Sequence, residues 1–344
     1  MPETRQLVTA REAKEPFFAG IDLGGTNIRV GVIDDLGRPL SWVSIPAEVQ
    51  RGPEDAAGRM GAAVHQAIRE AGVRSVTRVG FASAGPMDLP AGRYTTPINL
   101  KGWEDFPIRD RVAYHSGLPV TFENDANAAA YGEFWVGAGR GLASLVLLTL
   151  GTGVGCGVIL GGRVVRGEHS YGGESGHIIL DFTDAARVCG CGRRGCLEAY
   201  ASATAVIKRT REALSGGRRS SLSARLAAGE KLTPKLIAVE AEAGDEFSLE
   251  IVLETARYLG VGVVSLMHML QPEGVFLGGA MTFGGQESPL GRRFLDRVRE
   301  EVRRRALPHV ARRTSIDLAS LGGDAGVIGA AGVARQDCPV VGSG

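Results

Sequence analysis

The sequence predicts an α/β protein built from two related domains. Runs of apolar, strand-like residues alternate with helix-like segments along the whole chain, which is the pattern of this fold class. The 344 residues are too many for one small core and suit two domains of ordinary size. Two segments of similar character, 17–40 and 143–165, each read as a strand, a glycine-containing turn and a second strand, so we expect two related halves.

Composition and charge narrow the class of protein. Hydrophobic residues make up 44% and charged residues 22% of the chain, which is the balance of a globular protein in water. The 39 basic and 38 acidic residues nearly cancel, which argues against a broad surface for nucleic acid. The first residues are polar, and no stretch approaches about 18 consecutive apolar residues. We therefore expect a cytoplasmic protein with no nucleic-acid or membrane partner.

The first half of the chain divides into recognisable elements. The expected elements are a disordered lead (1–16), a hairpin of strands (17–40), an amphipathic helix (53–72), a strand within 76–86, a strand over 118–125 and an alanine-rich helix directly after it. The helix over 53–72 has Pro53 at its start and Gly72 at its end, which are typical boundary residues.

The second half repeats the alternation. Its expected elements are a second hairpin (143–165), a cysteine- and histidine-containing segment, a helix from about Glu198, a surface loop rich in Gly, Ser and Arg (214–232), a long helix (248–270), a strand (274–281), a small-residue helix (322–334) and a tail from about 335.

Three glycine-rich turns follow strands and are candidates for binding phosphate. Glycine lets the main chain approach a ligand closely, and successive N–H groups then bind an anion. The candidate residues are Asp22, Gly24, Gly25, Thr26 and Asn27 in the first turn, Gly151, Thr152 and Gly153 in the second, and Gly278 and Gly279 in the third. Asp22 could hold Mg²⁺ through water, because Mg²⁺ prefers one or two carboxylates together with phosphate oxygens.

The alternative is that each glycine pair merely makes a tight turn, which is glycine's commonest use. Three such turns at strand ends, one of them with an aspartate and a threonine, favour a nucleotide-binding site over simple turns. The pattern of a P-loop does not occur, and the glycines from Gly151 precede a strand rather than a helix, which disfavours a dinucleotide site.

Asp125 is the candidate general base. It lies where the strand over 118–125 meets a helix, with Asn124 beside it as a hydrogen-bonding neighbour. Phosphoryl transfer to an alcohol needs a carboxylate that accepts the hydroxyl proton. The alternative is that Asp125 caps the helix, a role in which aspartate is common. This segment alone gives the two interpretations equal weight.

Four residues form a candidate metal site. His177 precedes Cys189, Cys191 and Cys196, and one imidazole with three thiolates is a closed set typical of structural Zn²⁺. The alternative, a group of buried free cysteines, is less expected because three cysteines lie within eight residues.

These motifs, taken in order, resemble those of the ROK family of repressors and kinases. The resemblance rests on Asp22-Leu-Gly-Gly-Thr26, Glu123-Asn-Asp125, Gly151-Thr-Gly153, Glu174-Ser-Gly-His177 and the cysteine segment that ends at Glu198, and it covers about 17–333. Within the family, the chain is most similar to the bacterial glucokinases.

The resemblance implies an actin-like ATPase fold with two ribonuclease-H-like α/β domains around a cleft. It implies a small domain of 17–124 plus 306–334, a large domain of 125–305 and a tail of 335–344. ATP and Mg²⁺ would bind the glycine turns, Asp125 would be the base, and Zn²⁺ would bind His177 and the three cysteines. The implied hexose contacts are Gly85, Asn99, Asn124, Asp125, Glu174, His177 and Glu198. Homodimers or homotetramers are expected.

Several alternatives stay open. The sugar could be N-acetylmannosamine, N-acetylglucosamine or fructose rather than glucose, and polyphosphate could replace ATP. A sugar-sensing repressor of the family would need a DNA-binding module, and only about 16 residues precede Phe17. Two departures from the family pattern, Cys156 after the second turn and Ala280 in the third, bear on nucleotide affinity.

Overall fold

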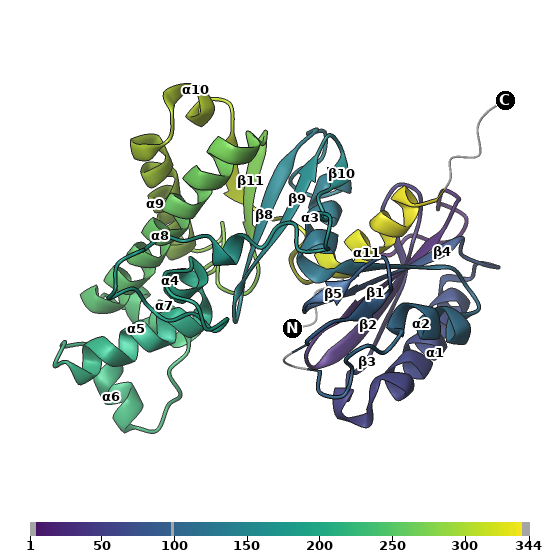
Figure 1. Cartoon of the computed structure of the whole chain (residues 1–344), viewed down its shortest axis with the longest axis horizontal. Coiled ribbons are helices and arrows are strands. Elements are labelled where there is room, and N and C mark those ends of the chain that lie inside the picture. The colour runs from purple at the N-terminus through teal and green to yellow at the C-terminus, as the bar shows by residue number, and fades with distance from the viewer. Residues whose placement is uncertain (1–4, 98–99, 339–344) are drawn as a thin grey trace. The chain divides into compact units, whose positions relative to one another are not determined.

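The computed structural model describes residues 5–97 and 100–338, and it divides into two compact units (Figure 1). The first unit comprises Met1–Gly141, Gly157–Gly173 and Leu321–Gly344, and the second comprises Leu142–Cys156 and Glu174–Ser320.

Strands and helices alternate as expected. The strands are β1 (Phe18–Leu23), β2 (Asn27–Ile33), β3 (Pro39–Pro46), β4 (Arg78–Ser83), β5 (Met87–Asp88), β6 (Arg93–Tyr94), β7 (Val120–Asn124), β8 (Leu145–Leu150), β9 (Val154–Leu160), β10 (Arg163–Val164), β11 (Gly274–Gly278) and β12 (Ser315–Leu318). The α-helices are α1 (Pro53–Ala71), α2 (Ile108–Ser116), α3 (Asp125–Trp135), α4 (Glu198–Ala201), α5 (Ala203–Ser215), α6 (Leu222–Ala227), α7 (Pro234–Glu242), α8 (Glu246–Leu270), α9 (Pro289–Arg305), α10 (Pro308–Ala311) and α11 (Ala325–Gln336). Short 3-10 helices are η1 (Val49–Arg51), η2 (Ser175–His177) and η3 (Gly322–Asp324).

The first sheet has the strand order β3-β2-β1-β4-β7. Strands β1, β2 and β3 form an antiparallel meander, whereas β4 is parallel to β1 and β7 is parallel to β4. The carboxyl ends of β1, β4 and β7 therefore meet at one edge, and that edge positions the candidate base.

Helices cover both faces of the first sheet: α1 and α2 pack on one face, and α3 and α11 on the other (Figure 1). Alternate residues of β1 serve the two faces, so Ile21 joins the core with α1 and Phe18 packs with Ile328 of α11. A Cβ at Gly20 would lie 1.9 Å from the carbonyl oxygen of Val327. Glycine is therefore required for the close approach of α11.

The second sheet has the order β10-β9-β8-β11-β12. Strands β8, β11 and β12 are parallel, and β9 and β10 form an antiparallel hairpin. Both sheets thus place hairpin strands on one side of a central strand and two parallel strands on the other, in agreement with the expected related halves. Helix α8 is the centre of the helical part of this unit and contacts α4, α5, α7 and α9.

The expected domain boundaries differ from this division. Residues 125–141 were expected in the second domain, but α3 packs on α11 in the first unit. A Cβ at Gly329 of α11 would lie 1.6 Å from the carbonyl oxygen of Ala128, so these helices touch through their backbones. Residues 157–173 also belong to the first unit. Conversely, residues 306–334 were expected in the first domain, but β12, which lies within them, extends the second sheet beside β11.

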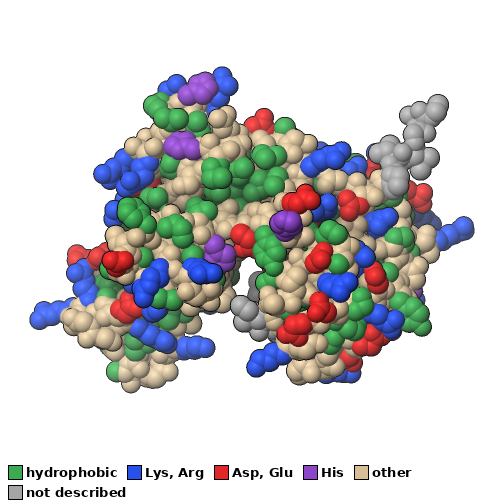
Figure 2. All heavy atoms as spheres, viewed as in Figure 1, with side chains coloured by type: hydrophobic (Ala, Val, Ile, Leu, Met, Phe, Trp, Pro, Cys, Tyr) green, Lys and Arg blue, Asp and Glu red, His purple; other side chains and the backbone are tan. Residues whose placement is uncertain are grey.

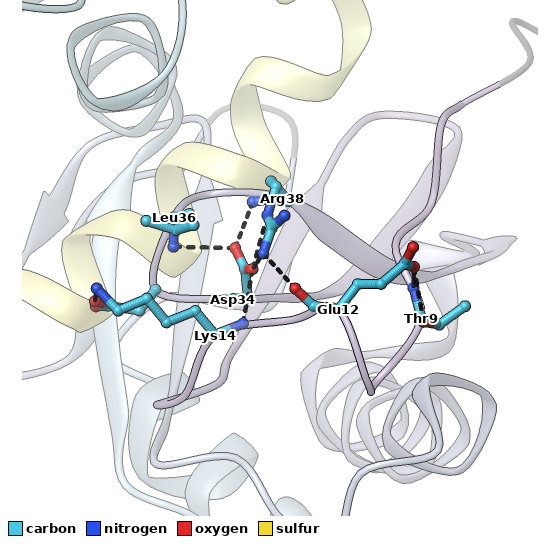
Figure 3. A network of polar contacts seen from close by, with 7 residues as sticks. Thr9, Glu12, Lys14, Asp34, Leu36 and Arg38 are labelled. Atoms are coloured by element: carbon cyan, nitrogen blue, oxygen red, sulfur yellow. Dashed lines mark hydrogen bonds and ion pairs between the residues drawn. The ribbon is translucent and has the colours of Figure 1, made fainter.

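Two segments are more ordered than the sequence predicts. Residues 5–16 were expected to be a disordered lead, but they pack on the turn between β2 and β3 (Figure 3). The buried carboxylate of Asp34 accepts hydrogen bonds from the backbone N–H of Lys14 (3.1 Å) and from Arg38 Nε (2.9 Å), and Arg38 Nη2 also donates to the carbonyl oxygen of Glu12 (2.8 Å). The segment 214–232, expected as a loop, contains α6.

Side chains of both charges occur across the face shown in Figure 2, in line with the net charge of +1. Among the residues that the structure describes, no helix combines the length and the hydrophobicity that a membrane span needs.

Candidate active site

Three strand ends of the first unit carry the candidate base, the first glycine turn and the Gly85 loop. Leu23 of β1 lies opposite Ser83 of β4, and Ser83 lies opposite Asn124 of β7. The residues that follow these strands are therefore gathered at one edge of the sheet: the turn from Gly24, the loop with Gly85, and Asp125. Parallel register brings together residues that are far apart in the sequence.

Asp125 is the first residue of α3, but it does not cap the helix. Asn124 is the cap, because its Oδ1 accepts from the backbone N–H groups of Ala126 (2.9 Å) and Asn127 (3.2 Å). Asp125 Oδ1 accepts from the N–H of Ala126 at 2.8 Å. The alternative role for Asp125 is thus filled by its neighbour, and the N-terminus of α3 favours the negative charge of Asp125.

Asp22, the second candidate carboxylate, lies near Asp125. Burial raises the pKa of Asp22 to about 6, Arg29 opposes this rise, and the charge of Asp125 adds to it. Arg29 Nη1 lies 3.5 Å from Asp22 Oδ2. A Cβ at Gly326, in the first turn of α11, would lie 2.9 Å from Asp22 Cγ, so this glycine admits the carboxylate. Two carboxylates so placed favour a bound cation.

The first glycine turn is open. A Cβ on Gly25 would meet nothing within 4 Å among the described residues, and the φ of Gly25 is not in the left-handed region. Neither packing nor backbone conformation within the described structure therefore requires glycine there. The ordinary explanation of a tight turn is weakened, and the remaining reason for glycine is the approach of a ligand.

The second glycine turn, in the second unit, has the same property at Gly151, where an added Cβ would also meet nothing within 4 Å of the described residues. Its carbonyl groups are held by the start of α5, because the backbone N–H of Ala203 donates to Gly151 O (2.9 Å) and Thr204 Oγ1 donates to Thr152 O (2.9 Å). A Cβ on Gly153 would lie 2.4 Å from Glu198 Oε2. The carboxylate of Glu198 thus packs directly on this turn.

The third glycine pair has a structural explanation. Gly278 ends β11 opposite Thr149 of β8. Gly279 has a φ of 91°, and a Cβ there would lie 2.4 Å from the carbonyl oxygen of Leu150. Packing against β8 therefore requires Gly279 whether or not a nucleotide binds beside it.

The structure brings the four candidate metal ligands together. The ligand atoms of His177, Cys189, Cys191 and Cys196 all lie within 4.8 Å of one another. Cys189 Sγ is 3.8 Å from His177 Nδ1, and Cys191 Sγ is 3.8 Å from Cys196 Sγ. A tetrahedral Zn²⁺ with bonds of about 2.3 Å to sulfur separates two thiolates by roughly 3.8 Å. The cluster could hold a metal ion and its spacing is compatible with Zn²⁺.

Two carboxylates border this cluster. Glu174 Oε2 lies 3.8 Å from His177 Nε2, whereas Cys189 Sγ lies 3.8 Å from the other ring nitrogen, Nδ1. Glu198 Oε1 lies 3.4 Å from Cys189 Sγ, and Glu198 Oε2 accepts from the backbone N–H of Val154 at 3.0 Å. Glu198 therefore joins the cysteine segment to the second glycine turn.

The loop after β4 is shaped by glycine and supported by a buried tyrosine. Gly85 has a φ of 117°, which favours glycine, and a Cβ there would lie 4.0 Å from the ring of Tyr94. The buried Tyr94 hydroxyl donates to Ser83 Oγ at 2.7 Å. Asn99, an expected sugar contact, lies outside the described residues.

The comparisons agree with these motifs. The model of the ROK family matches residues 18–337. A glucokinase of Halalkalibacterium halodurans is 33% identical over 322 residues, which cover 93% of this chain and 95% of the relative. The chain belongs to the ROK family.

Solved ROK structures share the fold. The ROK hexokinase from Thermus thermophilus has a TM-score of 0.79 and 36% identity, covering 93% of this chain and 98% of that one. The ROK family glucokinase from Streptomyces griseus, in complex with glucose and AMPPNP, has a TM-score of 0.74 and 34% identity, covering 93% of this chain and 100% of that one. The expected actin-like ATPase fold of the ROK kinases is confirmed.

Sequence reasoning missed several residues around the ROK motifs. Arg29 pairs with Asp22, Tyr94 supports the Gly85 loop, and Arg166 pairs with buried Glu123. Each partner is distant in sequence or on a separate element, so spacing gave no signal. Only Gly326 had a local cue, as a glycine in the first turn of an expected helix.

Proposed function

We propose that this protein is an ATP-dependent hexose kinase that converts glucose and ATP into glucose 6-phosphate and ADP. The observation that carries the proposal is the placement of Asp125 at the start of α3, on the same sheet edge as the open turn after Asp22. The similarity to glucokinases along nearly the whole chain supports the same activity.

In the proposed reaction, Asp125 accepts the proton of the sugar O6 hydroxyl. The oxygen then forms a bond to the γ-phosphorus while the bond from that phosphorus to the β,γ-bridging oxygen breaks, and ADP leaves with the electron pair. The start of α3 orients the carboxylate, because Asn124 caps the helix and the N–H of Ala126 binds one oxygen of Asp125. Exclusion of water from the site would limit hydrolysis of ATP.

The nucleotide would bind the glycine turns. Backbone N–H groups and short polar side chains would bind the phosphates, and we assign this role to Gly24, Gly25, Thr26, Asn27, Gly151, Thr152 and Gly153. Gly278 and Gly279 would bring the end of β11 near the nucleoside. Mg²⁺, when bound, supplies charge neutralisation on the phosphates, and Asp22 would hold it through water.

The sugar would be bound by polar side chains that satisfy its hydroxyls. We assign this role to Asn99, Asn124, Asp125, Glu174, His177, Glu198 and the backbone at Gly85. Since Asn124 Oδ1 already caps α3, its amide nitrogen is the group we assign to a sugar oxygen.

The Cys₃His cluster would hold a structural Zn²⁺. Four protein ligands leave no open position for a substrate, so the ion would stabilise the loop rather than act as a Lewis acid. It would also fix the positions of Glu174 and Glu198, which border the cluster.

The test is a coupled assay of ADP release with MgATP across glucose, mannose, fructose, N-acetylmannosamine and N-acetylglucosamine. Glucose should give the highest kcat/KM, and polyphosphate should not replace ATP. Asp125→Asn should lower kcat by roughly 10²–10⁴-fold and leave glucose binding by calorimetry nearly unchanged. Asp110→Asn, an exposed residue of α2, is the matched control.

Each outcome has a different consequence for the proposed function. Dominance of an N-acetylated sugar or fructose would keep the kinase mechanism but change the substrate. Normal turnover by the Asp125 variant would refute the base. Light scattering on the purified enzyme tests the expected homodimer or homotetramer, and fractionation of cells tests the expected cytoplasmic location.

A further inference from the structure

A buried ion pair lies beneath the start of the helix that carries Asp125. Glu123, the residue of β7 just before the Asn124–Asp125 pair, is 1% exposed. Burying a carboxylate is costly unless it is paired and hydrogen-bonded. Arg166 satisfies it, because Arg166 Nε donates to Glu123 Oε2 at 2.7 Å. Arg166 lies after β10, in a segment that sequence analysis did not single out.

The other oxygen of Glu123 is used by the helix start. Glu123 Oε1 accepts from the backbone N–H of Asn124 (2.9 Å) and from Asn127 Nδ2 in the first turn of α3 (3.0 Å). One carboxylate thus binds the residues on both sides of Asp125. The carboxylate therefore anchors both the last residue of β7 and the first turn of α3, between which Asp125 lies.

Arg166 is itself held in place. Its Nη2 lies 3.8 Å from Asp337 Oδ2, just beyond the end of α11. Burial alone would lower the pKa of Arg166, but Glu123 and Asp337 raise it above its ordinary value, so the guanidinium stays charged. The chain that carries Arg166 continues to Glu174 and His177, the residues assigned to the sugar in the second unit.

We propose that Arg166 is a positioning residue for the phosphoryl-transfer reaction, acting through Glu123 to orient Asp125. The proposal rests on the proposed function, in which Asp125 is the base. Arg166 pairs with Glu123 and Asp337, and we assign it a positioning role rather than a catalytic one. Its effect should appear in kcat, because a misdirected base costs the reaction more than it costs binding.

The ion pair could instead serve folding alone, and the two roles predict different results. In a folding role, Arg166→Ala lowers the thermal midpoint but the folded fraction turns over normally. In a positioning role, the folded variant has kcat lowered by roughly ten- to a hundredfold while KM for ATP stays within about twofold. Arg166→Ala leaves Glu123 buried without its ion-pair partner. The double variant Glu123→Gln with Arg166→Met removes the buried charge as well, so we expect it to fold better and use it as a second test.

The experiment compares Arg166→Ala, Arg166→Met, Glu123→Gln and the double variant, which combines Glu123→Gln with Arg166→Met, with the wild type. Arg163→Ala, an exposed arginine of β10 in the same segment, is the matched control and should keep wild-type kcat. We expect the losses in kcat to be non-additive, with the double variant no slower than Arg166→Met alone, because both residues act through one contact. Guanidinium chloride at millimolar concentration should partly restore kcat in Arg166→Ala and change nothing in the control.

Losses that multiply in the double variant, or a folded Arg166→Ala with wild-type kcat, would overturn the proposal. A test that does not depend on turnover is amide hydrogen exchange over 120–130, which should be faster in Arg166→Ala than in Arg163→Ala. Equal exchange would also overturn it. Wild-type turnover and the Asp125→Asn variant, measured in the same assay, report on the proposed function separately.

Discussion

Glu198 Oε2 accepts a hydrogen bond from the backbone N–H of Val154 at 3.0 Å, while Glu198 Oε1 lies 3.4 Å from Cys189 Sγ. One carboxylate therefore links the cysteine segment with the residue that follows the Gly151–Gly153 turn. Loss of the proposed Zn²⁺ should then affect the proposed nucleotide turn as well as the segment that would bind the ion.

The first prediction concerns Cys191→Ser. Zinc content should fall well below the expected one ion per chain, and kcat/KM should fall roughly ten- to a hundredfold, because the cluster no longer fixes Glu174 and Glu198. KM should rise for ATP as well as for glucose. Metal analysis and steady-state kinetics measure these effects, with Cys338→Ser as the control outside the cluster. Full zinc content and unchanged KM values would contradict the assignment.

The second prediction separates packing from ligand binding at a glycine. Gly25→Ala should leave stability unchanged or raise it by about 0.5 kcal/mol, because its backbone admits alanine and no described atom lies within 4 Å of the new Cβ. KM for ATP should rise roughly tenfold, because the methyl group would occupy the space that we propose for the phosphates. Thermal melts and kinetics test both effects.

The control for this prediction is Gly58→Ala in α1, where the nearest atom to the new Cβ is 3.8 Å away. Replacing a helical glycine should stabilise the protein by about 1 kcal/mol and leave KM for ATP unchanged. An equal KM for ATP in Gly25→Ala and the wild type would mean that the first glycine turn has only a structural role.

Much of the site could be predicted from the sequence because its signals are local. The four candidate metal ligands lie within one short segment, and Asp125 directly follows a strand. The alignment of Leu23, Ser83 and Asn124 at one edge of the sheet was not predictable. It depends on the parallel register of β1, β4 and β7, which are separated in the sequence by whole helices.

The missed contacts share a physical cause. Glu123 of β7 and Arg166, which follows β10, pair across segments that no periodic pattern connects, so only folding of the chain brings them together. The polar composition of 5–16 predicted disorder, but Asp34 and Arg38 bind that segment from a distant turn. Helix α6 is short and is held by contacts such as Arg225 Nη1 with Glu240 Oε1 at 2.8 Å rather than by a strong apolar stripe.

The third prediction concerns stability in acid. Burial would raise the pKa of Asp34, but hydrogen bonds from Arg38 and Lys14 outweigh it and hold the pKa below 3.8. A depressed pKa contributes stability above the unfolded value, and this contribution is lost as pH falls through the folded value. Asp34→Asn should therefore cost about 1–3 kcal/mol at pH 7.

The difference between Asp34→Asn and the wild type should shrink as the pH is lowered to about 3. Urea unfolding at both pH values measures it, with Asp110→Asn as the exposed control. A difference that is the same at both pH values would show that the charge of Asp34 does not stabilise the fold.

The last prediction sets stability against function at Asp22. Its folded pKa, about 6, lies above the ordinary 3.8, so the folded state binds this proton more tightly and stability falls as pH rises from about 4 through 6. Without Mg²⁺ and ATP, Asp22→Asn should be more stable than the wild type by about 1–3 kcal/mol at pH 8 and equal to it near pH 4. Activity with MgATP should fall sharply in the same variant. Urea unfolding in EDTA at the two pH values, beside steady-state kinetics, tests both effects. A variant less stable than the wild type at pH 8 would mean that the pairing of Asp22 with Arg29 outweighs the cost of burying its charge.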